Sequence, residues 1–296
     1  MSKLFESLQK AELIGADEFP LTESRGGNGA LRSVPAQVVV DTPQVALPEV
    51  QVEEPVVFPA APAEPQRSVK LRVSALSPVF PFDAKNHAAA EQYRIIRTKV
   101  LHHPRQPKML VVSSGGSGDG KTVTSVNLAA SFALKPDVRV ALIDADMRRP
   151  QIANLLGMDV APGLGEVLAG SKTFAEAAAF VENIPNLCVL TAGSANQRPA
   201  ELLDSPRWRS LLVFLRESFD YVVFDAPPIS AVADYELVQL VCDGVVLVAR
   251  PDHSDRKTHE KALQAVPKEK LLGLVLNCVD NWFLWRTHGY EYYSRA

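Results

Sequence analysis

From about residue 84 onward, hydrophobic positions alternate between two patterns. Short continuous apolar runs, each typical of a buried strand, are separated by segments whose apolar residues recur at helical spacing. The expected strands cover residues 109–112, 138–143, 187–191, 221–224, 244–249 and 271–277. The expected helices cover residues 86–101, 123–132, 234–241 and 257–265, with further helical stretches between 163 and 186. Repeated strand–helix alternation predicts an α/β fold with an open, mostly parallel sheet and helices on both faces.

The first 83 residues lack this alternation. Residues 1–15 place their apolar side chains on one face of a short amphipathic helix, which either docks on its own domain or recognises a partner or membrane surface. Residues 16–83 hold eight prolines between Pro35 and Pro78, interleaved with glutamates, and no glycine occurs between Gly29 and Gly115. That composition predicts an extended, flexible linker without a packed core.

The C-terminal segment, residues 281–296, follows the expected domain of residues 84–280. Three of the chain's six tyrosines, Tyr290, Tyr292 and Tyr293, lie within the last seven residues. The pattern leaves two alternatives open, which are phenols accessible to another molecule and an aromatic tail packed on the domain.

The composition limits the expected partners and cellular compartment of the protein. A hydrophobic fraction of 47% and a charged fraction of 22% are ordinary for a globular protein, and a net charge of -3 gives no electrostatic reason to expect nucleic acid as a partner. Cys188, Cys242 and Cys278 share no metal-ligand spacing, so we expect buried thiols in a reducing compartment. No apolar run approaches membrane-spanning length, and we expect a cytoplasmic protein.

A glycine-rich stretch connects the strand at 109–112 to the helix that follows. Gly115, Gly120, Lys121 and Thr122 fill the pattern G-x-x-x-x-G-K-[ST]. Glycines let successive backbone N–H groups face phosphate oxygens, and the start of the next helix adds positive potential. Lys121 can reach the β- and γ-phosphates, and the Thr122 hydroxyl can ligate Mg²⁺. This context favours a phosphate-binding loop over an accidental glycine-rich turn and predicts a P-loop NTPase fold.

Two later strands also end on acids. Asp144 and Asp146 follow one strand, with Arg148 next, and Asp225 follows another. The carboxyl ends of parallel strands form the ligand crevice of an open sheet. At this place the acids could bind Mg²⁺ or accept a proton, and Arg148 could bind the negative charge of a phosphate. The alternative is that Asp144 and Asp146 cap the following helix. With a phosphate loop present, we favour the functional interpretation.

Three charged residues, Glu91, Arg94 and Arg97, share one face of the helix expected at 86–101. From spacing alone we favour a solvated face with an internal Glu91–Arg94 pair.

Together these residues resemble the bacterial tyrosine kinases of capsule and exopolysaccharide assembly. The resemblance covers about residue 84 to the C-terminus, and the strand ending in D-x-D-x-R is its most diagnostic motif. Supporting matches are Arg148-Arg149-Pro150, Gly163-Leu164-Gly165-Glu166, Pro199-Ala200-Glu201-Leu202-Leu203, Pro227-Pro228 and Ala233-Asp234. The chain departs from the family at Ser117, where proline is usual, at Arg198, where asparagine is common, and in its sparse tyrosine cluster, which Glu291 interrupts.

The resemblance implies an ATP- and Mg²⁺-dependent protein-tyrosine autokinase. The implied catalytic residues are Lys121, Asp144, Asp146 and Arg148, and the implied metal residues are Thr122, Asp144 and Asp225. The implied nucleotide contacts are Gly115, Gly116, Ser117, Gly118, Asp119, Gly120, Lys121, Thr122, Val123 and Asn277, the last near the adenine.

The resemblance also implies an assembly at the inner face of the cell membrane. Glu91, Arg94 and Arg97 match the family's E-x-x-R-x-x-R, which builds a homo-oligomeric ring, and the tail tyrosines are the acceptors phosphorylated in trans. A membrane co-polymerase that regulates polysaccharide chain length would supply a cytoplasmic activator segment, and a cognate tyrosine phosphatase would reverse the modification. The enzyme would thereby regulate polysaccharide polymerisation and export.

Two other functions share features with this sequence. A partitioning-type or septum-positioning ATPase shares the fold, but it carries a second lysine in the loop where this chain has Gly116. A non-kinase ATP-binding switch subunit of a polysaccharide assembly complex stays open, because the tyrosine tail is sparse.

Overall fold

The computed structural model describes residues 67–74, 77–80, 87–194, 198–229, 233–251 and 253–279. All of these residues belong to the compact unit Glu54–Ala296. The expected N-terminal helix, most of the expected linker, Asn86 and the tail of residues 281–296 lie outside the described residues.

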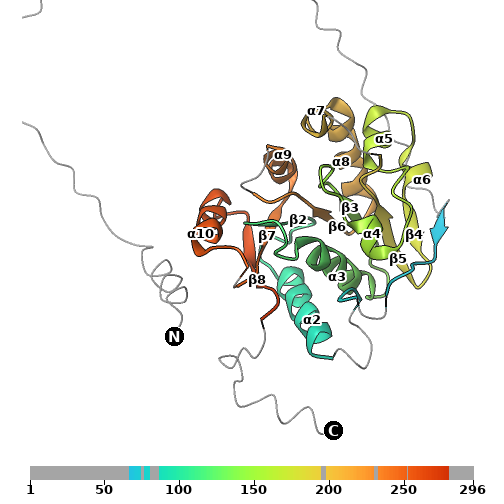
Figure 1. The fold of residues 1–296 in the computed structure, drawn as a ribbon. Coiled ribbons are helices and arrows are strands. Elements are labelled where there is room, and N and C mark those ends of the chain that lie inside the picture. The colour runs from blue at the N-terminus through green and yellow to red at the C-terminus, as the bar shows by residue number, and fades with distance from the viewer. Residues whose placement is uncertain are drawn as a thin grey trace, which may run out of the picture. The chain divides into compact units, whose positions relative to one another are not determined.

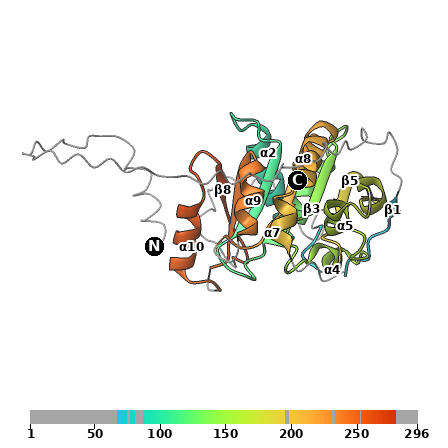
Figure 2. The ribbon, with the colours of Figure 1, turned by 90° about the horizontal axis from the view of Figure 1, so that it is seen from above.

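A single sheet organises this unit (Figure 1). Its strands are β1 (Ser68–Val69), β2 (Met109–Ser114), β3 (Val140–Asp144), β4 (Ala179–Val181), β5 (Ile184–Leu190), β6 (Tyr221–Asp225), β7 (Gly244–Ala249) and β8 (Leu271–Leu276). Their order is β1-β4-β5-β3-β6-β2-β7-β8, and among the described strands only the β4–β5 pair is antiparallel. The predicted mostly parallel sheet is confirmed. Figure 2 shows β1 and β8 at opposite edges, with α10 beside β8.

Helices connect the strands and cover both faces of the sheet. They are α2 (His87–Leu101), α3 (Lys121–Ala133), α4 (Ile152–Leu156), α5 (Leu164–Ala169), α6 (Phe174–Ala177), α7 (Pro199–Leu203), α8 (Pro206–Ser218), α9 (Asp234–Val241) and α10 (Arg256–Ala265). The helix α3 packs on β2, β3, β5 and β6, and α2 packs on α3. Within the described part of the chain, no helix is long and apolar enough to cross a membrane.

The central strands are continuous apolar runs because both of their faces are covered. In β3, Ala141 and Ile143 enter the hydrophobic cluster that includes residues of α5, α8 and α9. Their neighbours Val140 and Leu142 enter the cluster on the opposite face, which includes residues of α3 and α4. All residues of β3 are buried, which explains why its sequence shows no alternation between apolar and polar positions.

Part of the segment expected to be a linker packs on the domain. Val79 is buried, the Phe80 backbone N–H donates to the Asn127 side chain at 2.7 Å, and the Asn127 amide donates to the Pro78 carbonyl at 2.9 Å. Asn127 lies on α3, which follows the glycine loop. The linker composition therefore gives way to domain packing before residue 84.

The strands β1 and β4 were not predicted from the sequence. They are only two and three residues long, too short for a period to be read. Both depend on pairing partners, because β4 runs antiparallel to β5 and β1 parallel to β4. Their strand conformation therefore comes from pairing with neighbouring strands, and the local sequence pattern does not reveal it.

The strand order brings the acids and the glycine loop together. β6 lies between β3 and β2, with Asp144 paired in register to Asp225, and Val112 also paired to Asp225. The carboxyl ends of these three parallel strands therefore meet at the middle of the sheet, where open α/β folds bind ligands.

Candidate active site

The loop between β2 and α3 requires glycine at particular positions. Gly118 and Gly120 have φ values of 87° and 96°, in the left-handed region that favours glycine. At Gly120 a Cβ atom would also collide with the Asn277 side-chain amide. Because α3 begins directly after this loop, at Lys121, its unpaired first-turn N–H groups add to an anion-binding concavity.

Asp119 and Asn277 brace the loop. The fully buried Asp119 carboxylate accepts hydrogen bonds from the Gly116 N–H at 2.9 Å and from the Ser254 hydroxyl at 2.7 Å. The Asn277 amide donates to the Asp119 carbonyl at 2.9 Å. Both residues were expected to contact nucleotide, and the structure places both in contacts that hold the loop in its conformation.

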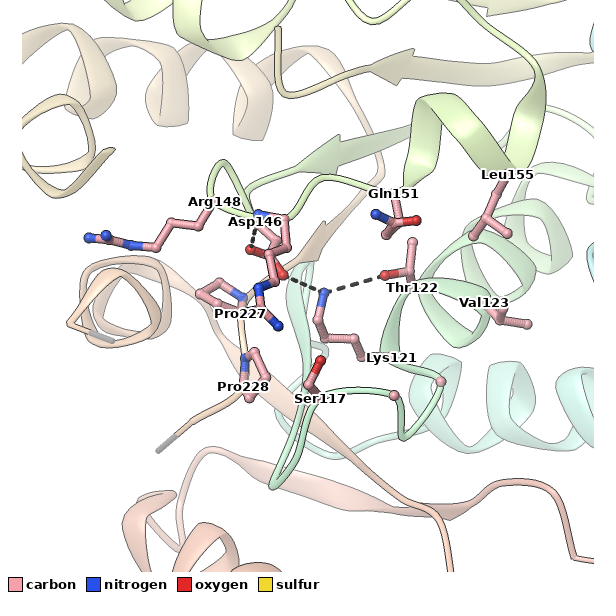
Figure 3. A pocket seen from close by; sticks show the side chains of 13 residues that line it. Ser117, Lys121, Thr122, Val123, Asp146, Arg148, Gln151, Leu155, Pro227 and Pro228 are labelled. Carbon is pink, nitrogen blue, oxygen red and sulfur yellow. Dashed lines mark hydrogen bonds and ion pairs between the residues drawn. The ribbon is translucent and has the colours of Figure 1, made fainter. Parts of the chain in front are cut away.

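Lys121 lies among the acids at the strand ends. Its Nζ atom is 2.8 Å from Asp146 Oδ2, 3.4 Å from Asp225 Oδ2 and 3.3 Å from Thr122 Oγ1. Its side chain is only 11% exposed. Figure 3 shows the amino group pointing between Asp146 and Thr122. The structure thus assembles residues that are separated by up to 104 positions in sequence.

The charges of this cluster shift one another's protonation. Burial alone would lower the pKa of Lys121, but the negative charges of Asp225 and Asp146 outweigh burial and raise that pKa. Burial raises the pKa of Asp144 well above its usual range, and the nearby Asp225 carboxylate adds to the effect. Burial also raises the pKa of Asp225, although Lys121 opposes the shift.

The cluster fits a divalent cation bound together with a nucleotide. Asp144 Oδ2 accepts from the Ile152 N–H at 3.1 Å, whereas Oδ1 is buried without a hydrogen-bond donor. Three carboxylates, when ionised, exceed the single ammonium by two negative charges. Within the described residues no group of three or more His, Cys, Asp or Glu side chains could hold a metal ion alone. Mg²⁺ would therefore draw on phosphate oxygens and water as well as these side chains, as it usually does.

A cleft of about 680 Å³ opens beside Lys121, within the range of small-molecule sites. Its walls come from the glycine loop, the start of α3, the turn after β3, α4 with the residue before it, and the turn after β6. The lining residues are Ser117, Gly118, Gly120, Lys121, Thr122, Val123, Asp146, Arg148, Arg149, Gln151, Leu155, Pro227 and Pro228. Among the expected nucleotide contacts, Gly115, Gly116, Asp119 and Asn277 are not among these lining residues.

Asp234 binds the Arg148 side chain, a contact that was not predicted from the sequence. In the sequence, Asp234 appeared only as part of the family match Ala233-Asp234. Asp234, the first residue of α9 and 1% exposed, binds the guanidinium through two contacts, at 2.7 Å to Nε and 3.1 Å to Nη2. In Figure 3 the Arg148 side chain extends away from Lys121. The pKa of Arg148 is raised by this hydrogen-bonded carboxylate. The local sequence pattern around Asp234 does not predict this ion pair, because its two residues are 86 positions apart.

The charged face of α2 contributes no cleft-lining residue. Arg94 Nη1 is 3.1 Å from Glu91 Oε2, and both side chains are about half exposed, which confirms the pair inferred from spacing. Arg97 instead donates to the Ser131 carbonyl on α3 at 2.6 Å. The three acceptor tyrosines expected in the tail lie outside the described residues.

These features define a P-loop NTPase. They are a glycine loop between strand and helix, the lysine of the G-K-[ST] motif, and acids at the ends of adjacent parallel strands. In agreement, residues 106–284 match a ParA family model described as NUBPL iron-transfer P-loop NTPase.

Known relatives narrow the class. The tyrosine-protein kinase YwqD of Bacillus subtilis (strain 168) is 38% identical over 192 residues, 64% of this chain and 80% of that protein. The tyrosine-protein kinase CpsD of Streptococcus pneumoniae serotype 4 is 32% identical over 195 residues, 65% of this chain and 85% of that protein. The solved kinase domain of Escherichia coli tyrosine kinase ETK superposes with a TM-score of 0.62 at 29% identity, covering 70% of this chain and 82% of that one. The chain belongs to the bacterial tyrosine kinase family, so the expected enzyme class is confirmed.

The environment of Asp144 predicts a gain of stability when its charge is removed. The pKa of Asp144 is higher in the folded than in the unfolded chain, so ionising it costs folding free energy as pH rises between those two values. We expect Asp144→Asn to raise the free energy of unfolding of the nucleotide-free protein by about 1 kcal/mol at neutral pH. The gain should vanish at acidic pH, where the wild-type carboxyl is protonated.

The matched variant Asp146→Asn should have the opposite effect, because it removes the 2.8 Å partner of Lys121. Urea unfolding of both variants across pH measures the contrast. Equal destabilisation by the two substitutions would contradict this description of the charge cluster.

The Arg148–Asp234 pair gives a second stability prediction. Arg148→Ala leaves a carboxylate that is 1% exposed without its partner, so we expect a loss of about 2 kcal/mol, moderated because Arg148 is half exposed. The double variant Arg148→Ala/Asp234→Ala should recover part of that loss in thermal unfolding. A single variant as stable as wild type would show that other groups compensate Asp234.

Proposed function

We propose that this protein is an ATP- and Mg²⁺-dependent tyrosine autokinase that modifies the C-terminal tyrosines of a neighbouring copy. The observation that carries the proposal is the position of Lys121, beside the glycine loop and within 3.4 Å of both Asp146 and Asp225. A lysine at this place can exchange carboxylate partners for phosphate oxygens and can stabilise charge that develops during transfer.

The transfer requires one proton acceptor. As the phenol oxygen bonds to the γ-phosphorus, the bond from that phosphorus to the β,γ-bridging oxygen breaks, ADP leaves and the phenol proton passes to a carboxylate. Asp146 suits this role because it lines the cleft, whereas Asp144 and Asp225 are fully buried behind it. Its Oδ1 atom is held by the Arg149 N–H at 3.1 Å, which fixes the carboxylate's orientation.

Three other residues suit the metal. Thr122, Asp144 and Asp225 would hold Mg²⁺ directly or through water, and the ion when bound would neutralise phosphate charge. The buried Asp144 Oδ1 without a donor, and the excess of carboxylates over ammonium groups, support this assignment.

The proposed setting is an assembly at the membrane. Glu91 and Arg94, half-exposed on α2, would contact a neighbouring copy in a ring, and Tyr290, Tyr292 and Tyr293 would be the acceptors in trans. An inner-membrane polysaccharide co-polymerase would supply the activating cytoplasmic segment, and a tyrosine phosphatase would reset the enzyme. Through this cycle the kinase would regulate polysaccharide polymerisation and export from the inner face of the membrane.

Replacing Lys121 tests the chemistry. We expect Lys121→Met to lower phosphate incorporation into the tail by a factor of about 10² or more, because an electrostatic group aimed at the transferring phosphate is lost. Tryptic-peptide mass spectrometry after incubation with Mg²⁺–ATP, with and without the activator segment, measures the tail. Lys261→Met, at an exposed position on α10, is the matched control. A wild-type tail that stays unmodified with activator present would overturn the proposed tail autophosphorylation and favour a switch driven by ATP binding.

Substitutions on α2 can distinguish an effect on assembly from an effect on folding. The Glu91–Arg94 pair is half exposed, so Glu91→Ala/Arg94→Ala should reduce oligomer size in light scattering and change the melting temperature little. Arg97→Ala should lower the melting temperature, because the Ser131 carbonyl loses its donor. Oligomers of unchanged size in the double variant would rule out this face as the ring contact.

A further inference from the structure

Two consecutive arginines, Arg148 and Arg149, line the cleft and differ in their contacts. Both are exposed. Asp234 balances the Arg148 charge through two hydrogen bonds. Within the described part of the chain, the Arg149 guanidinium forms no ion pair or hydrogen bond with another side chain, and only its backbone N–H contacts one. One uncompensated positive charge therefore remains at the rim.

The Arg149 backbone is fixed beside the proposed proton acceptor. Its N–H donates to Asp146 Oδ1 at 3.1 Å and approaches the Asp146 carbonyl at 3.2 Å. Met147 and Arg148 form the turn between Asp146 and Arg149. A phenol that gives its proton to Asp146 would therefore place its flanking residues within reach of the Arg149 side chain.

Lys121, deeper in the cleft, is not available to bind the residues next to an acceptor tyrosine. Lys121 is paired with Asp146 and Asp225, and its proposed partners during transfer are phosphates. Of the three cationic side chains among the described residues that line the cleft, only Arg149 lacks an acidic side-chain partner in the described part of the chain. An acceptor segment that enters from the rim would therefore be favoured if it carried an acid next to its tyrosine.

The chain's own tail has this feature. In residues 281–296 the only acid is Glu291, directly between Tyr290 and Tyr292. As a sequence feature Glu291 interrupts the tyrosine cluster, but it is complementary in charge to Arg149.

We propose that Arg149 is a specificity-determining residue, which binds the carboxylate adjacent to an acceptor tyrosine, and that Glu291 of a second copy supplies that carboxylate. The substrate class is then tyrosine segments with a neighbouring acid. This inference rests on the proposed autokinase function.

A charge-exchange experiment with two full-length proteins tests it. The enzyme carries Tyr290→Phe, Tyr292→Phe and Tyr293→Phe, so it cannot serve as acceptor, and the acceptor carries Lys121→Met, so it cannot act as kinase. Arg149→Glu is introduced into the enzyme, Glu291→Gln or Glu291→Lys into the acceptor, and phosphate on each acceptor tyrosine is quantified by mass spectrometry. Arg105→Glu, an exposed reversal in the loop before β2 and outside the cleft, is the matched control.

The expected pattern is reciprocal. Glu291→Gln should lower kcat/KM for the acceptor about fivefold, and either single reversal should lower it about tenfold or more, with smaller effects at high salt. Combining Arg149→Glu enzyme with Glu291→Lys acceptor should restore kcat/KM to within about threefold of the unaltered pair, because the cycle re-forms the attraction. Arg105→Glu should change neither value.

Two outcomes would overturn the inference in distinguishable ways. Robust transfer by the unaltered pair, with penalties of the two reversals that simply add, would exclude the Arg149–Glu291 contact while leaving the autokinase intact. No transfer by the unaltered pair, with the activator segment present, would remove the autokinase proposal and this inference with it.

Discussion

The active site depends on the balance between one buried ammonium group and three buried carboxylates. Lys121 is 11% exposed and reaches Asp146 and Asp225, while Asp144 keeps an oxygen without a donor. Burying unpaired charge is costly, so this arrangement persists only because packed strands hold each acid in place. The excess negative charge of these carboxylates, when ionised, suits the proposed metal ion, and Lys121 provides a cation that can bind phosphate.

The glycine loop takes its shape from elements that follow it far along the chain. Ser254, just before α10, and Asn277, just after β8, both bind Asp119. The loop's pattern is local, but its geometry is completed by the segments after β7 and β8. The family resemblance implied that Asp119 and Asn277 contact the nucleotide. In the structure both residues support the loop, a role compatible with a neighbouring nucleotide.

Neighbouring residues of one type acquire different properties through their partners. Arg148 and Arg149 are equivalent in composition, yet Asp234 at the start of α9 neutralises only Arg148. The difference between the two arginines is therefore set by a residue 86 positions away from Arg148. The same reasoning applies to α2, where Glu91 and Arg94 pair with each other and Arg97 turns to α3.

The sequence by itself determined the α/β class, the central strands and the phosphate loop, because these depend on local periodicity, glycine conformation and short motifs. It also placed Asp144, Asp146 and Asp225 at strand ends. Only the tertiary structure decided that β6 inserts between β3 and β2, which sets Asp144 beside Asp225. The short strands β1 and β4 and the partner of Arg148 were likewise decided there. Each rests on contacts between different segments of the chain, which no local pattern encodes.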